Sequence, residues 1–163
     1  MRETSVCING KDVTFSPGKH NELQKATIEE FVSRFAPNSE CLYVGNTTEK
    51  DLLKSVAKLQ ELRFAITLYD KMPDGVLYSE EKNWLCFIES ATFVGLMEPK
   101  RVKEIGEMTE GVTAGKIYVT AFFDFKTYKK FSETLAWETG VWIAGMPDHM
   151  IYLNGDKFLG PRK

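Results

Sequence analysis

The chain has 163 residues, which is enough to bury one hydrophobic core, and it is predicted to form a single domain over residues 1–163. Hydrophobic residues make up 43% of the chain and charged residues 27%, a composition typical of a soluble globular protein. The formal net charge of -2 provides no overall positive field, so nucleic-acid binding would require a local basic patch.

The cysteines and the start of the chain indicate a cytoplasmic protein. Cys7, Cys41 and Cys86 are odd in number and widely spaced, and the last two lie in apolar runs, which is typical of buried free thiols in a reducing compartment. Met1-Arg2-Glu3-Thr4 does not lead into the apolar segment of a signal peptide, and the longest apolar runs are far shorter than a membrane span. We therefore expect cytoplasmic localisation and no membrane partner.

The first part of the chain alternates short strands with helices. Its apolar patterns predict a hairpin, a long helix, a short buried strand, a second helix and a further strand, at residues 5–15, 20–35, 41–45, 47–62 and 64–68. Ser16-Pro17-Gly18 separates the hairpin from the long helix.

The second part begins with a central hairpin and continues with alternating helices and strands. The hairpin strands are predicted at about residues 74–78 and 84–89; a helix, a strand, a helix and two strands are then predicted at residues 98–108, 116–121, 128–137, 141–144 and 150–153. Asn154-Gly155 is a strong hairpin-turn signal. The mixture predicts an α/β fold in which helices cover both sides of a mixed sheet.

Asp74 and Glu89 are two acids that the central hairpin would bring together. If the strands are symmetric about their turn, Val76 faces Phe87 and Asp74 faces Glu89, with Cβ atoms roughly 5 Å apart. Mg²⁺ typically binds one or two carboxylates together with water and phosphate oxygens, so a bound cation would explain this pair. Glu22, near the start of the long helix, is a third acid that could support the ion. The alternative is that Asp74 lies in a turn after a proline and Glu89 simply ends a strand.

Short motifs distributed from about residue 6 to the end resemble those of one known family. The earlier motifs are His20-Asn21-Glu22-Leu23-Gln24-Lys25, Leu42-Tyr43-Val44-Gly45, Lys71-Met72-Pro73-Asp74, Asn83-Trp84-Leu85, Ile88-Glu89-Ser90-Ala91-Thr92, Pro99-Lys100-Arg101 and Tyr118-Val119-Thr120-Ala121-Phe122. The C-terminal motifs are the most specific: Ala136-Trp137-Glu138-Thr139, Val141-Trp142-Ile143-Ala144, Pro147-Asp148-His149, Asn154-Gly155-Asp156 and Phe158-Leu159-Gly160-Pro161-Arg162. In this order and spacing they resemble the catalytic C-terminal domain of the BsuBI/PstI restriction endonuclease family. Larger members of that family carry an additional N-terminal domain, which this chain is expected to lack.

The resemblance implies the PD-(D/E)xK nuclease fold, a restriction-endonuclease-like α/β core with a mixed central sheet flanked by helices. It also implies that Asp74 and Glu89 are ligands of Mg²⁺, for which Mn²⁺ could substitute. The usual lysine of this motif would fall at Ala91, so Lys71 or Lys100 could supply the positive charge as a catalytic residue. Two neighbouring cations at the start of a helix would also make a reasonable phosphate site, and these are Lys100 and Arg101.

By the same resemblance, the expected function is that of a type II restriction endonuclease domain, which hydrolyses double-stranded DNA. A homodimer is expected because protein symmetry then mirrors a palindromic site, and a cognate DNA methyltransferase is a further expected partner. The alternative is a catalytically weakened or inactive relative that acts as a DNA-binding or protein-interaction module. Three departures favour it: Asn46 stands where the family tends to have Asp, and Phe93 and Val94 stand where it tends to have Ser and His.

Other polar and aromatic residues give weaker signals. His20 and His149 are the only histidines, and neither has zinc-type spacing with a cysteine. His20 is therefore interpreted as a residue that caps a helix. The aromatic residues between Phe122 and Phe131 could stack on bases, but their spacing favours core packing.

Overall fold

The computed structural model of the protein describes residues 3–45, 51–66, 71–92, 95–155 and 161. In these ranges, one mixed sheet has the strand order β4-β3-β5-β6-β7-β8-β9, and a separate hairpin has β1 and β2. The strands are β1 (Thr4–Ile8), β2 (Lys11–Phe15), β3 (Glu40–Val44), β4 (Leu53–Lys54), β5 (Gly75–Ser79), β6 (Trp84–Ser90), β7 (Gly115–Phe122), β8 (Thr139–Ile143) and β9 (Met150–Leu153). The helical segments are α1 (Lys19–Ala26), the π-helical η1 (Thr27–Phe31), α2 (Val32–Phe35), α3 (Val56–Glu61), α4 (Pro99–Met108), α5 (Phe125–Phe131) and the 3-10 turn η2 (Ser132–Thr134).

The centre of the sheet combines antiparallel and parallel pairs. β5 runs antiparallel to β6, whereas β6, β7 and β8 are parallel to one another. Parallel neighbours need crossover connections, and these contain α4 between β6 and β7 and α5 between β7 and β8. The carboxyl ends of the three parallel strands therefore meet at one edge of the sheet.

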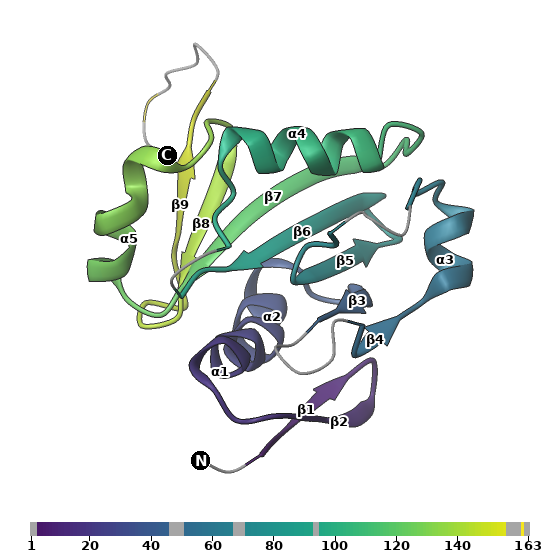
Figure 1. The fold of residues 1–163 in the computed structure, drawn as a ribbon, viewed down its shortest axis with the longest axis horizontal. Helices are drawn as coiled ribbons and strands as arrows, with labels where there is room; N and C mark the ends of the chain where they lie inside the picture. Colours follow the sequence, from purple (N-terminus) through teal and green to yellow (C-terminus); the bar gives the residue numbers. More distant parts are fainter. Residues whose placement is uncertain (1–2, 46–50, 67–70, 93–94, 156–160, 162–163) are drawn as a thin grey trace.

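Helices cover both faces of this sheet, as the sequence predicts (Figure 1). Side chains alternate between faces along a strand. On β6, Leu85 and Phe87 pack in the hydrophobic cluster that includes Ile105 of α4. Cys86 and Ile88 point to the opposite face and pack in a second cluster with residues of α1 and η1. The fold is therefore the predicted three-layer arrangement, with α4 on one face and the helix formed by α1, η1 and α2 on the other.

The first hairpin packs on the α1 side of the molecule. Its turn has Asn9 at φ 51° and Gly10 at φ 80°, the left-handed conformation that Asn-Gly favours in two-residue hairpin turns. Val6, Ile8 and Phe15 are buried in the α1-side cluster. The predicted hairpin is confirmed.

Several predicted elements were wrong in type or extent. The predicted helix over 47–62 contains only α3, because Leu53 and Lys54 instead pair with β3 at the edge of the sheet. Phe64 is buried in the α4-side cluster, but no strand forms at residues 64–66, and residues 47–50 and 67–70 lie outside the described ranges.

The predicted helix over 128–137 also stops early. The helical segment ends at Thr134, after which Leu135 enters a third apolar cluster and the Ala136 amide donates to the Met97 carbonyl at 2.9 Å. Tyr128 and Phe131 pack against that same cluster, so the apolar spacing that predicted a longer helix reflects shared burial instead. No helix of the described part of the chain is long and apolar enough to cross a membrane.

Candidate active site

The register of the central hairpin brings Asp74 next to Glu89. Val76 pairs with Phe87 and Gly75 with Ile88, as predicted, and Asp74 follows Gly75 at the end of this ladder. The amide of Ser90 donates to Oδ2 of Asp74 at 2.8 Å, which fixes the first acid against the strand that carries the second. The position of Gly95 completes this arrangement, since a Cβ built there would lie 3.6 Å from Glu89 Oε2 and 3.7 Å from Asp74 Oδ2. The same Cβ would lie only 3.2 Å from the Ser90 carbonyl oxygen, so Gly95 packs closely against both acid-bearing segments.

Glu89 is buried and paired with an arginine from α4. Only 2% of Glu89 is exposed, and its side chain lies on the α4 face because it shares parity with Phe87 on β6. Arg101 donates to Glu89 Oε1 through Nη2 at 3.1 Å and through Nε at 3.4 Å. Its Nη1 lies 3.3 Å from Oε2 of Glu104. Among the described residues, no donor contacts Glu89 Oε2.

Asp74 is paired with a histidine from α1. Nε2 of His20 lies 3.2 Å from Asp74 Oδ2, the same oxygen that accepts from the Ser90 amide. The N-cap residue of α1 is Gly18, whose backbone has φ 145°, and no side chain caps this helix with a hydrogen bond. The interpretation of His20 as a helix-cap residue was therefore wrong, and its side chain belongs to the acidic site.

A buried glutamine fastens α1 to both acid-bearing strands. Nε2 of Gln24 donates to the carbonyls of Gly45 and Asp74, each at 2.9 Å, and its Oε1 accepts from the Ser90 hydroxyl at 2.8 Å. Ser90 points to the α1 face because it alternates with Glu89. One amide group therefore holds three segments in place around the acids.

The pKa values of the site reflect burial and the paired charges. Burial, and then the nearby Asp74 carboxylate, raise the pKa of Glu89 to about 7, against the opposing effects of Arg101 and Lys71. The hydrogen bond to Asp74 is the largest effect on His20 and raises its pKa, although burial acts in the opposite direction. The site therefore holds two acids whose mutual repulsion is only partly offset by basic groups from α1 and α4.

The other predicted site residues lie at different distances from the acids. Lys71 is exposed but close enough to lower the pKa of Glu89. Lys100 is exposed in the first turn of α4. Glu22 is also exposed and lines a hollow of about 300 Å³ whose other lining residues include Lys19 and Asp124. Across the ranges that the structure describes, no group of three or more acidic, histidine or cysteine side chains is arranged to hold a metal ion.

Sequence reasoning missed the roles of His20 and Gln24, and it assigned Arg101 only to phosphate binding. The pattern did contain a signal. Arg101 shares a helical stripe with the buried residues Ile105 and Met108, and a charged residue in such a stripe is expected to have a buried partner. His20 similarly precedes the buried Gln24 by one helical turn.

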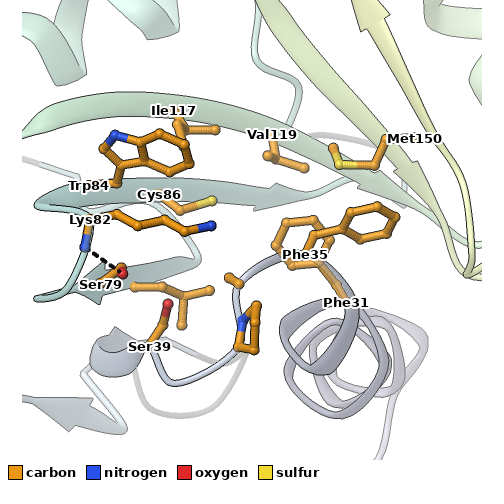
Figure 2. Close-up of a pocket in the computed structure, with 13 residues that line it drawn as sticks. Phe31, Phe35, Ser39, Ser79, Lys82, Trp84, Cys86, Ile117, Val119 and Met150 are labelled. Atoms are coloured by element: carbon orange, nitrogen blue, oxygen red, sulfur yellow. Dashed lines mark hydrogen bonds between the residues drawn. The ribbon is translucent and has the colours of Figure 1, made fainter. Parts of the chain in front are cut away.

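A second hollow, on the α1 face, has a different character. Its volume is about 180 Å³, and its described lining contains no Asp, Glu or His. Figure 2 shows Trp84, Val119 and Met150 of the sheet around this space, with Phe31 and Phe35 of the helix beside it. Burial raises the pKa of Cys86 in this lining to about 12, so it stays a thiol at neutral pH. The hollow is apolar, and the paired acids remain the candidate active site.

A mixed sheet covered by helices, with two acids at the ends of neighbouring central strands, defines a restriction-endonuclease-like α/β fold. A family model described as the BsuBI/PstI restriction endonuclease domain matches residues 4–156, and the chain therefore belongs to this family. Both the predicted family and the predicted fold class are confirmed.

Individual relatives support the same assignment. The chain is 43% identical over 152 residues to the type II restriction enzyme BsuBI of Bacillus subtilis, covering 93% of this chain and 48% of that protein. It is 30% identical over 156 residues to the type II restriction enzyme AplI of Arthrospira platensis, covering 90% of this chain and 47% of the relative. The solved structure of SdaI restriction endonuclease superposes with a TM-score of 0.90 at 34% identity, covering 98% of this chain and 50% of that one. The chain thus spans about half the length of these relatives.

Proposed function

We propose that this domain hydrolyses phosphodiester bonds in double-stranded DNA with Mg²⁺, as a type II restriction-endonuclease-like catalytic domain. The observation that carries the proposal is the pair Asp74 and Glu89, held at the ends of β5 and β6 with one oxygen of each less than 4 Å from the Cβ position of Gly95. Family membership supports the same function. The lengths of the relatives leave room for further segments to contribute to the activity of a whole protein.

The donor set fits a hard divalent ion. Mg²⁺ binds through one or two carboxylates and keeps several waters, so Asp74 and Glu89 suffice as its protein ligands, and Mn²⁺ could replace it. When bound, such an ion would activate water and stabilise the departing oxygen of the phosphodiester. Glu22 remains proposed as a supporting acid that acts at longer range.

The remaining residues of the site would orient the acids and the DNA. His20 and the Ser90 amide hold one oxygen of Asp74, which directs the carboxylate. Lys71 is proposed to position water or phosphate next to Glu89, because its charge already acts on that side chain. Lys100, exposed at the start of α4, is proposed to contact a DNA phosphate.

The proposed partners follow from this activity. The DNA substrate is double-stranded, and a homodimer would match the two-fold symmetry of a palindromic site. A cognate methyltransferase in the same restriction–modification system and a cytoplasmic location are also proposed. Cys41 and Cys86 are buried free thiols, which agrees with a reducing compartment.

A second candidate function is that of a non-catalytic relative that binds DNA or protein. It is favoured by the ion pair between Arg101 and Glu89, because a guanidinium already occupies one carboxylate oxygen of the pair. The departures at Asn46, Phe93 and Val94 also favour it, and these three residues lie outside the described ranges.

Plasmid cleavage in Mg²⁺ or Mn²⁺ separates the two candidates. We expect Asp74→Ala and Glu89→Ala to lower the cleavage rate at least roughly 100-fold, because a metal ion contributes several kcal/mol to transition-state stabilisation. Glu107→Ala, which changes an exposed acid on α4, is the matched control and should cleave like the unmodified chain. An unmodified chain that neither cleaves nor binds Mn²⁺ in calorimetry would establish the non-catalytic candidate instead.

A further inference from the structure

The position at which the nuclease motif normally has lysine is apolar in this chain. Ala91 is only 2% exposed and belongs to a buried cluster with Phe122, Leu135 and Val141. Ala91 also lines the hollow that it shares with Glu22 and Asp124, and its methyl group supplies no positive charge to the acids. The positive charge of the site must therefore come from another element.

Arg101 is the cation that the fold brings to Glu89. It lies on the buried side of α4, in line with Ile105 and Met108, and is only 8% exposed. Buried charges are normally paired, and its described partners are Glu89 and, at the rim, Glu104. Lys71 and Lys100 are exposed, and within the described residues neither forms an ion pair with Asp74 or Glu89.

The two carboxylate oxygens of Glu89 have different surroundings in this ion pair. Nε and Nη2 of Arg101 both donate to Oε1, whereas Oε2 is the oxygen that lies 3.6 Å from the Cβ position of Gly95. The guanidinium is planar and presents its donors in a fixed fork, so it can hold a carboxylate in one orientation. The Glu104 carboxylate holds the other end of that fork.

We propose that Arg101, contributed by α4, is the residue that positions Glu89 and keeps its Oε2 directed toward the metal ion. This inference rests on the proposed function, since it assumes that the two acids bind a divalent cation. Arg101 is a positioning residue in this scheme, because it acts on the ion through Glu89.

The direction in which Mn²⁺ affinity changes when Arg101 is removed tests this proposal, and calorimetry measures it. Removing a positive charge next to a cation site should strengthen binding if repulsion is the main effect of Arg101. If Arg101 positions Glu89, its removal should weaken binding, by about 10- to 100-fold, as is typical when a residue that orients a metal ligand is lost. We expect weaker binding for Arg101→Ala and for Arg101→Met, which keeps much of the aliphatic stem. Arg101→Lys should give an intermediate value, because it retains the charge without the fork.

Two further measurements separate positioning from a loss of folding. Thermal unfolding verifies that each variant is folded, and Lys103→Ala, an exposed lysine on the same helix, should bind Mn²⁺ like the unmodified chain. Millimolar guanidinium chloride should restore Mn²⁺ affinity to Arg101→Ala, whereas sodium chloride at the same ionic strength should not.

Either unchanged or tighter Mn²⁺ binding by the folded Arg101→Ala and Arg101→Met variants would overturn the proposal. Absence of rescue in a folded Arg101→Ala variant would count against it as well. These results differ from failure of the proposed function, in which the unmodified chain itself would bind no Mn²⁺ and cleave no DNA.

Discussion

The folded protein disfavours the charged form of Glu89 even with the guanidinium of Arg101 beside it. Its folded pKa of about 7 lies above the ordinary value of 4.5 for a glutamate, chiefly because of burial. A raised carboxyl pKa means that the folded state binds the proton more tightly than the unfolded state. Stability is therefore lost as the pH rises from about 4.5 through 7.

The direction of this pH dependence predicts how Glu89→Gln changes the free energy of unfolding in a buffer that contains a chelator. The neutral amide should raise the free energy of unfolding relative to the unmodified chain at pH 8, by an amount on the order of 2 kcal/mol, and the advantage should disappear near pH 4.5. Urea denaturation at several pH values measures the difference. His20 shifts stability in the same direction, but it is present in both proteins, so an advantage independent of pH would contradict the assignment to Glu89.

At this scale the sequence revealed the acids better than their partners. Asp74 and Glu89 could be placed together because strand alternation and the register of a tight hairpin are local properties. Arg101 could not be joined to Glu89, because the pairing depends on where a crossover helix packs. The same holds for His20, whose contact with Asp74 spans separate elements.

At the scale of elements, Gln24 of α1 determines how the helix is attached to the sheet. Its amide forms hydrogen bonds with the carbonyls of Gly45 and Asp74 and with the Ser90 hydroxyl. The substitution Gln24→Ala removes all three of these hydrogen bonds. Unsatisfied buried polar groups cost about 1 to 3 kcal/mol each. We expect Gln24→Ala to lower the free energy of unfolding by about 3 kcal/mol in chemical denaturation.

The exposed Gln60 of α3 provides the comparison for that change, and Gln60→Ala should alter stability by less than about 0.5 kcal/mol. Equal effects of the two substitutions would mean that the Gln24 contacts contribute little.

The long elements were predictable because their apolar periodicity is strong, as in α4 and the helix from Lys19 to Phe35. The short edge strand β4 and the early end of α5 were not, because pairing with β3 and burial of Leu135 override local preference.

At the scale of the whole molecule, one edge combines the acids with a basic helix. α5 carries Lys126, Lys129 and Lys130 beside Phe125, which is 45% exposed. The adjacent hollow reaches from Asp124, at the start of this helix, to Ala91 just beyond β6. In Figure 1, α5 lies on the side toward which β6 points. With a net charge of only -2, such a local patch is where a DNA backbone would bind.

Replacing the three lysines of α5 with alanine should therefore weaken DNA binding in chelator. The slope of log affinity against log salt should fall by about 0.9 for each phosphate contact that is lost. Fluorescence anisotropy with a labelled duplex at several salt concentrations measures both quantities. The control replaces Lys54, Lys58 and Lys82, which lie on β4, on α3 and in the turn between β5 and β6. Equal effects of both triple variants would show that only total charge matters.

The apolar surroundings of Ala91 have a consequence for how this domain can change over evolutionary time. A lysine introduced there would have to leave the cluster of Phe122, Leu135 and Val141 through the hollow that Ala91 also lines. Loss of Arg101 alone would in turn leave Glu89 buried without the guanidinium that forms an ion pair with it. A change from one arrangement to the other would therefore require coordinated substitutions at position 91 and on α4, in two separate parts of the fold.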